Sequence, residues 1–250
     1  AMIGMGAANV PTYRFLTACG ADPTRIVACD AGGILGTFRR EYELDSAFSE
    51  QWKVCSQTNP DGRRGGIEEA LRGADVCMAF SAGGIIKPEW VKGMARDAIV
   101  FACANPVPEI WPWEAKEAGA RIVATGRSDF PNQVNNSLVF PGIFRGVLDV
   151  RARAITDEMA IAAAHELARC ARERGIHEES ILPTMEEWHV PMRLAVATAT
   201  KAQEQGLARV ERTRDQVHIL AESKVRAAHE AMRVLLREGL IVAPSAAHSA

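Results

Sequence analysis

The first half of this chain alternates short apolar runs with longer helical runs, and this alternation constrains the fold more than any other feature. Five runs have the composition of β-strands, and most of them reach Gly, Asp, Asn or Ser within a few residues. They cover residues 1–3, 26–29, 76–80, 99–102 and 121–124. Helices are expected between them at 9–19, 67–71, 89–95 and 114–118. Such alternation predicts an α/β fold, with helices on both faces of a doubly wound parallel sheet.

The pattern changes after Asp149, where strand-like runs stop and alanine-rich amphipathic patterns begin. Helices are expected at 156–174, 191–205 and 215–237. We therefore expect a sheet domain over 1–150, a C-terminal helical extension over 151–243 that packs on the same domain, and a disordered tail at 244–250. The apolar stripe of the last helix fits either a contact between subunits or packing within the chain.

Composition favours an ordinary soluble protein. Of the 250 residues, 48% are hydrophobic and 24% are charged, and the net charge of -2 gives no reason to expect nucleic acid or an anionic membrane as a partner. No apolar run approaches the roughly 20 residues that span a bilayer. The six cysteines are scattered without a CxxC pair, which argues against a zinc site or a disulfide framework. We expect a cytoplasmic protein.

A glycine loop follows the first expected strand and opens the first expected helix. The first glycine of such a loop permits a tight turn, and the second lets backbone amides approach a pyrophosphate at the positive end of the helix. The candidate cofactor-binding residues of this loop are Gly4, Met5, Gly6, Ala7, Ala8 and Asn9. This context predicts that residues 1–150 form a Rossmann-like dinucleotide-binding domain.

Asp30 ends the second expected strand, at the separation from the glycine loop that suits a ribose-binding acid. A carboxylate there accepts hydrogen bonds from ribose hydroxyls and repels a 2′-phosphate, so NAD is favoured over NADP. Arg39 and Arg40 lie downstream and leave NADP possible. Ser81, Ala82 and Gly83 follow another strand, and their small size would let a cofactor lie against the backbone, although an ordinary strand-to-helix turn explains them equally well.

Neutral amides crowd the segment ATGRSDFPNQVNNSLVFPGIFRG, residues 124–146. Buried amides are costly without hydrogen bonds, so a cluster beside an apolar run suggests groups kept for a ligand. If Pro131 lies in the first turn of a helix, Asn132, Asn135 and Asn136 share one face of it. Asn105, in the segment FACANPVPEI, follows the strand at 99–102. Caps of a strand end or a helix turn are the alternative roles for Asn105 and Asn136.

Read in order, the glycine loop, Asp30 and the segments SAGGIIKPEWV, FACANPVPEI and ATGRSDFPNQVNNSLVFPGIFRG resemble the C-terminal, nucleotide-binding part of malic enzymes, particularly the bacterial type. The resemblance runs from Ala1 to about Gly206. It implies oxidative decarboxylation of malate to pyruvate and CO2 with NAD or NADP and a divalent Mg or Mn ion. By the same resemblance, Asn105 and Asn136 contact the substrate, and Asn135 is assigned to the cofactor side.

The resemblance also implies that the catalytic tyrosine, the catalytic lysine and the metal-binding carboxylates lie upstream of the glycine loop. We therefore expect no catalytic residue and no metal ligand in this chain. Tyr13 and Tyr42 do not match the context of the catalytic tyrosine. The expected partners are malate and pyruvate, a missing N-terminal catalytic domain or chain, and further copies in a homodimer or higher homo-oligomer.

Two alternatives remain open at this point. The chain could be a stand-alone nucleotide-binding or regulatory module that has lost catalysis, or part of another dehydrogenase with a similar two-domain plan.

Overall fold

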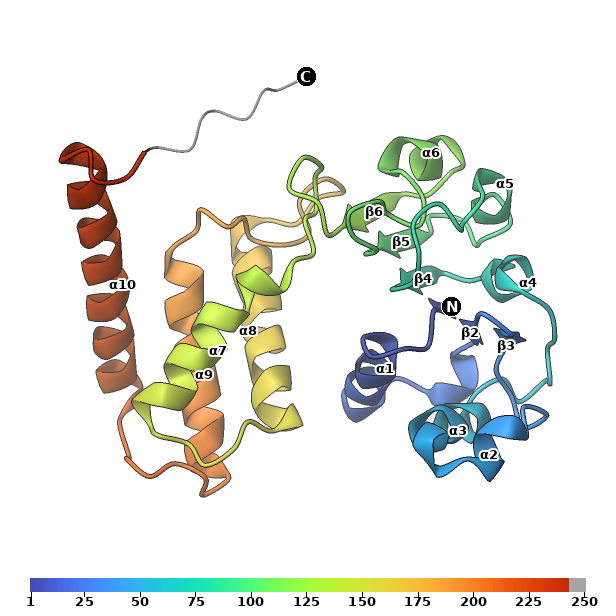
Figure 1. Ribbon diagram of the computed structural model, residues 1–250, viewed down its shortest axis with the longest axis horizontal. Helices are drawn as coiled ribbons and strands as arrows, with labels where there is room; N and C mark the ends of the chain where they lie inside the picture. Colours follow the sequence, from blue (N-terminus) through green and yellow to red (C-terminus); the bar gives the residue numbers. More distant parts are fainter. Residues whose placement is uncertain (243–250) are drawn as a thin grey trace. The chain divides into compact units, whose positions relative to one another are not determined.

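The computed structural model describes residues 1–242, and their elements form two compact units (Figure 1). Unit 1 comprises Ala1–Asn136 and Ala171–Leu182, and unit 2 comprises Ser137–Cys170 and Pro183–Ala250. The division therefore lies at Asn136, whereas the sequence pattern places the change of character after residue 150. The tail expected at 244–250 lies outside the described residues.

Unit 1 is built on a six-stranded sheet in the order β3-β2-β1-β4-β5-β6. The paired strands are parallel except for β3, which runs antiparallel to β2. Their bounds are β1 Met2–Ile3, β2 Ala28–Asp30, β3 Gly33–Ile34, β4 Val76–Ala79, β5 Ile99–Ala102 and β6 Ile122–Thr125. The strand order reverses between β1 and β4, so the loops after these two strands diverge at the carboxyl edge and leave room for a ligand.

Successive residues of each strand point to opposite faces of the sheet, and each face carries its own core. Met2 and Ala28 pack with residues of α1 (Asn9–Ala18) and α3 (Ser49–Gln57). Ile3 and Cys29 pack on the other side with residues of α4 (Ile67–Leu71), α5 (Pro88–Val91) and α6 (Pro112–Glu117). Figure 1 shows these two sets of helices apart from each other, with the strands between them. The predicted doubly wound α/β fold is confirmed.

The sequence pattern missed three elements between β2 and α4, namely β3, α2 (Glu41–Leu44) and α3, and it also missed the helix α7 (Phe140–Asp149). The two-residue strand β3 has no alternating pattern to reveal it, and α3 carries few apolar residues, of which Val54 and Cys55 are buried.

The helix considered at Pro131 is wrong. Asn132 has a φ of 57°, which interrupts any helix there, and Gln133 forms an isolated parallel bridge with Thr125. A short 3₁₀ turn, η3, covers Asn136–Leu138, and the following helix α7 covers Phe140–Asp149 with Pro141 in its first turn. The asparagines of this segment therefore do not share a helical face.

Unit 2 is helical and contains α7, most of α8 (Asp157–Arg174), α9 (His189–Glu204) and α10 (Arg214–Arg237), close to the three helices expected after residue 150. Helices α7 and α9 cross closely because glycines face the crossing: a Cβ at Gly142 would lie 2.5 Å from the Leu194 Cβ. Val217 and Ala221 bury one face of α10. Within residues 1–242, none of the helices is both long enough and apolar enough to cross a membrane.

Candidate dinucleotide and substrate site

The glycine loop joins β1 to α1 in a tight turn. Gly4 has a φ of 86°, and a Cβ there would lie 2.6 Å from the carbonyl oxygen of Phe80 at the end of β4. A Cβ at Gly6 would meet no atom within 4 Å, so the backbone here faces open space at the start of α1. Ala7 and Ala8 are exposed in the same turn, whereas the Met5 side chain is buried in the core. The loop thus fits a dinucleotide phosphate.

Asn9 occupies the position where the fingerprint has its third glycine. Its side chain is completely buried, and its Nδ2 donates to the carbonyl oxygens of Ile3 at 3.0 Å and Met78 at 3.2 Å. These bonds tie α1 to β1 and to β4. The geometry therefore gives the Asn9 amide nitrogen a structural role, whereas the buried Oδ1 of the same side chain has no hydrogen-bond partner among the described residues.

Asp30 ends β2 and is surrounded by hydrogen-bond donors. Its Oδ1 accepts from the backbone N–H of Gly32 at 2.8 Å and from Arg39 Nη1 at 3.0 Å. Its Oδ2 accepts from Arg39 Nη2 at 3.2 Å and from the Tyr42 hydroxyl. Burial and the neighbouring carboxylate of Asp30 raise the pKa of Tyr42 to about 12, so Tyr42 remains a donor at neutral pH. The ribose role of Asp30 stays a prediction.

The loop after β4 contains Ser81, Ala82 and Gly83, and it packs against the loop after β5. A Cβ at Gly83 would lie 2.7 Å from the carbonyl oxygen of Val107. The N–H of Gly84 donates to the carbonyl oxygen of Pro108 at 2.9 Å. The structure thus gives a physical reason for the small residues: they allow close contact between two loops at the carboxyl edge.

Glu109 links the same two loops, and sequence reasoning missed it. This fully buried carboxylate accepts from the N–H of Ser81 through Oε1 at 2.6 Å and from the N–H of Ala104 through Oε2 at 2.9 Å. Burial raises the pKa of Glu109, and the backbone donors oppose that shift. The sequence feature that could have revealed Glu109 is a carboxylate within the proline-rich apolar stretch just after Asn105, where a charged residue is unusual.

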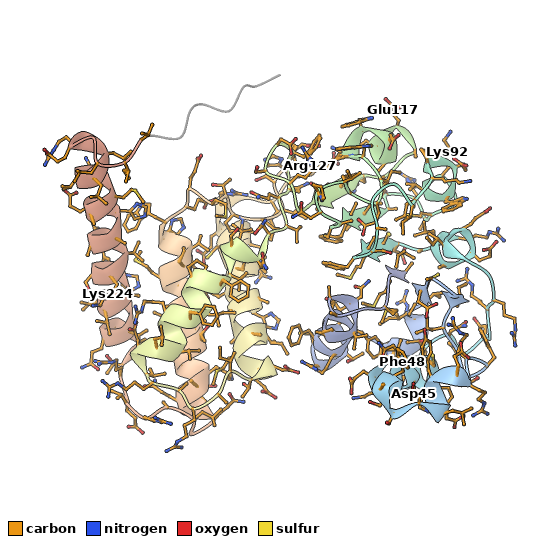
Figure 2. The ribbon with its side chains drawn as sticks, in the orientation of Figure 1. Asp45, Phe48, Lys92, Glu117, Arg127 and Lys224 are labelled. Atoms are coloured by element: carbon orange, nitrogen blue, oxygen red, sulfur yellow. The ribbon has the colours of Figure 1, made fainter. Side chains whose placement is uncertain are left out.

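Asn105 and Asn136 lie on the loops that follow β5 and β6. Both are exposed, and neither makes a side-chain hydrogen bond within residues 1–242. The two loops touch, because Nη1 of Arg127, the residue labelled in Figure 2, donates to the carbonyl oxygen of Pro106 at 2.9 Å. The Nδ2 of Asn135 donates to the carbonyl oxygen of Gly126 at 3.4 Å. The structure thus places two amides with free hydrogen-bonding capacity on adjacent loops at the carboxyl edge.

Asn132 differs from its neighbours because its amide is fully used inside unit 1. It is buried, and its Nδ2 donates to the carbonyl oxygens of Val123 at 3.1 Å and Glu178 at 2.7 Å. Its Oδ1 accepts from the N–H of Ile181 at 2.9 Å. Asn132 therefore anchors the segment 178–181 to β6, and it has no amide group left for a ligand.

The tyrosines and the possible metal ligands of residues 1–242 are engaged in other contacts or lie apart from one another. Tyr13 is buried, and its hydroxyl donates to Gln57 Oε1 at 2.8 Å, while Tyr42 is engaged with Asp30. Within residues 1–242, no group of three or more His, Cys, Asp or Glu side chains is arranged to hold a metal ion. The Mg or Mn ion that the resemblance implies therefore does not fit the described residues.

Sequence comparison shows which known proteins this chain resembles. The family model described as "Malic enzyme, NAD binding domain" matches residues 24–203. The chain is 43% identical to an NAD-dependent malic enzyme of Geobacillus stearothermophilus over 83% of its length and 42% of that protein. It is 46% identical to an NADP-dependent malic enzyme of Rhizobium meliloti over 68% of its length and 21% of that protein.

The structural likeness extends beyond the matched family range. The crystal structure of Entamoeba histolytica malic enzyme superposes with a TM-score of 0.94 at 46% identity, covering 98% of this chain and 51% of that one. For the malic enzyme of Pyrococcus horikoshii the TM-score is 0.85 at 43% identity, over 95% of this chain and 56% of that one. The chain thus spans about half the length of most of these relatives. It belongs to the malic enzyme family and contains the NAD-binding domain of that family.

Proposed function

We propose that this chain is the nucleotide-binding half of an enzyme that oxidatively decarboxylates malate to pyruvate and CO2. The observation that carries the proposal is the pair of exposed amides, Asn105 and Asn136, on adjacent loops at the carboxyl edge of a sheet whose first loop is open at Gly6. Ligands of doubly wound sheets bind at this edge. Residues 4–9 and the two amides would thus hold a dinucleotide and its substrate at the same edge.

The amides suit this chemistry because their charge does not change during the reaction. A nicotinamide dinucleotide held by the glycine loop would supply the hydride acceptor for the carbon that carries the malate hydroxyl. Asn136 and Asn105 offer both donors and acceptors to the hydroxyl and the carboxylates of malate, without a protonation change of their own. Asn135 is proposed to serve the cofactor, and the backbone of residues 4–9 and 81–83 is proposed to bind its phosphates and nicotinamide end.

The acid, the base and the metal ligands are proposed to come from a part of the enzyme outside this chain. This follows from the relatives, of which the chain spans about half, and from the engagement of Tyr13 and Tyr42 in other bonds. We also propose a cytoplasmic homodimer or higher homo-oligomer. All six cysteines are free thiols, as expected for a reducing compartment.

The test of the substrate role is Asn136→Ala in the native protein, with malate, NAD or NADP, and Mn2+. We expect kcat/KM for malate to fall by about tenfold or more, because a hydrogen bond to a charged group contributes on the order of 1.5–3 kcal/mol. Dinucleotide affinity, measured by calorimetry without malate, should stay within about twofold, which corresponds to a change in binding free energy of less than about 0.5 kcal/mol. Asn132→Ala is the matched control. Because the Asn132 amide is buried and bonded within unit 1, this variant should lower the free energy of unfolding more than it lowers kcat/KM for malate.

Other outcomes would contradict the proposal. Equal loss of malate turnover and dinucleotide binding in Asn136→Ala would assign Asn136 a structural role. A native protein that consists of this chain alone, and that forms no NADH or NADPH from malate with Mn2+, would favour the stand-alone nucleotide-binding or regulatory module.

A further inference from the structure

A shallow hollow lies beside the turn between β2 and β3, on the side where the fingerprint places the adenosine ribose. It is lined by Ala31, Gly32, Gly33, Ile34, Phe38, Arg39, Arg64, Gly65 and Gly66. The loop that carries Arg64 is fixed to this turn, because the N–H of Ile34 donates to the carbonyl oxygen of Gly65 at 2.9 Å. Glycines form much of the wall, so a ligand can approach the backbone closely.

Asp30, which borders this hollow, has no acceptor capacity left. An ionised carboxylate offers about four lone-pair positions. Gly32 and Arg39 occupy those of Oδ1, and Arg39 and Tyr42 occupy those of Oδ2. A ribose diol can bond to Asp30 only by displacing one of these donors. The bidentate ion pair with Arg39 also cancels the charge by which Asp30 would repel a 2′-phosphate.

The remaining charges around the hollow leave one cation unpaired. Arg39 also binds Glu41, which is more than half exposed and therefore screened by solvent, and Arg40 is paired with Glu43. Glu69 accepts from the N–H of Gly66 at the start of α4. Arg64 is exposed and forms no ion pair within the described residues; its Cζ lies 3.9 Å from the centroid of the Phe38 ring.

We propose that Arg64, stacked on Phe38, binds the 2′-phosphate of NADP, so that this domain accepts NADP as well as NAD. A guanidinium is suited to a phosphate because its fork donates two parallel hydrogen bonds, and the aromatic ring holds its plane in place. The neutralised Asp30 presents no opposing charge to the phosphate. This inference rests on the proposed dinucleotide-binding function and specifies which dinucleotides the site accepts.

The experiment compares NAD+ and NADP+ binding to the full chain by calorimetry, in the parent protein and in Arg64→Gln. We expect both dinucleotides to bind the parent. Arg64→Gln should weaken NADP+ binding by about tenfold or more, because a charge-assisted hydrogen bond is lost, and leave NAD+ binding nearly unchanged. Arg40→Gln is the matched control, since it removes the same charge from an exposed arginine outside the hollow. It should change neither affinity appreciably.

Salt supplies a second readout. Raising the ionic strength should weaken NADP+ binding more than NAD+ binding in the parent, and the difference should disappear in Arg64→Gln. Binding of NAD+ without NADP+, equal losses of both in Arg64→Gln, or a loss of NADP+ binding confined to Arg40→Gln would overturn the Arg64 assignment alone. If neither dinucleotide binds, the proposed function fails together with it.

Discussion

Glu109 shows how one residue can organise a site without facing it. Its two carboxylate oxygens accept one backbone N–H each from the loops after β4 and β5. An isolated buried carboxylate is costly, and hydrogen-bond donors on both oxygens make its burial tolerable. The loop that carries Asn105 therefore takes its position in part from a fully buried side chain.

Glu109→Gln tests this role through stability and its pH dependence. An amide can accept only one of the two N–H groups, so the variant should be less stable at about pH 5 by about 1–3 kcal/mol. The folded state raises the pKa of Glu109 above the value of about 4.3 in an unfolded chain. The folded protein thus holds the proton more tightly, and this contribution to stability is complete below the unfolded pKa and is lost as the pH rises through the folded pKa.

Because Gln does not titrate, the stability difference between the parent and Glu109→Gln should shrink as the pH rises from 5. Urea unfolding at several pH values measures it. Glu117→Gln, on the exposed side of α6, is the control, and it should leave the free energy of unfolding nearly unchanged at every pH (Figure 2). A difference that stays constant or grows with pH would contradict the account.

The asparagines show how far residue types alone can carry a prediction. The sequence pointed to a cluster of amides kept for a ligand, and it placed Asn132 in the same group as Asn135 and Asn136. The structure separates them, because Asn132 is buried and bonded to the backbone whereas Asn136 is exposed. The difference arises from the positive φ at Asn132 and from the segment 178–181, some fifty residues away, which no local pattern reveals.

At the scale of elements, the crossing of α7 and α9 depends on the absence of side chains. Gly142 and Gly146 are four residues apart and therefore lie on one face of α7. A Cβ at Gly146 would meet the Thr198 Cβ at 3.0 Å and would also lie against the carbonyl oxygen of Ala195. The close approach of the two backbones requires glycine at both positions.

Gly146→Ala should destabilise the protein by about 1–3 kcal/mol, because overpacking at the crossing outweighs the gain of about 1 kcal/mol in helix propensity. Urea unfolding at neutral pH measures the change. Leu148→Ala lies on the same helix at a position that is 62% exposed, and it should stay within about 0.5 kcal/mol. A Gly146→Ala variant as stable as the parent would show that α7 and α9 can move apart at no cost.

Elements with clear apolar spacing and turn residues at their ends follow from the sequence, whereas elements without such a pattern do not. The helix at Ile67–Leu71 and the strand at Ile99–Ala102 match the expected ranges, because apolar spacing and turn residues mark their ends. The antiparallel strand β3 and the helices α2 and α3 escaped, because tertiary packing rather than local pattern stabilises them. Of the site, the glycine loop and the position of Asn105 were predictable, but Glu109 and the saturation of Asp30 depend on three-dimensional contacts.

At the scale of the whole molecule, α10 carries large apolar side chains that remain exposed within residues 1–242. Ile219, Met232, Leu235 and Leu236 are all at least 37% exposed, although Val217 and Ala221 on the same helix are buried. Met232, Leu235 and Leu236 have i, i+3 and i+4 spacing and so share one face of α10, and grouped exposed apolar side chains mark an interface more often than scattered ones. A second copy of the chain is the partner that the proposed homo-oligomer supplies.

Leu235→Glu should lower the oligomeric state, because a charge placed in an apolar interface is costly to desolvate. Sedimentation at several protein concentrations measures it. Lys224→Glu changes the charge of the same helix without touching an apolar side chain, and it should leave the assembly unchanged (Figure 2). Assembly that survives Leu235→Glu would place the subunit contact elsewhere.

The two hydrogen bonds of Glu109 couple the positions of the loops after β4 and β5. Ser81 and Ala104 are held by the two oxygens of one rigid carboxylate, so neither loop can shift without pulling on the other. In the proposed function, a dinucleotide bound at the loop after β4 would therefore restrain the loop that carries Asn105. Cofactor binding and the position of the proposed substrate amide would then be coupled through Glu109, together with the backbone bond from Gly84 to Pro108.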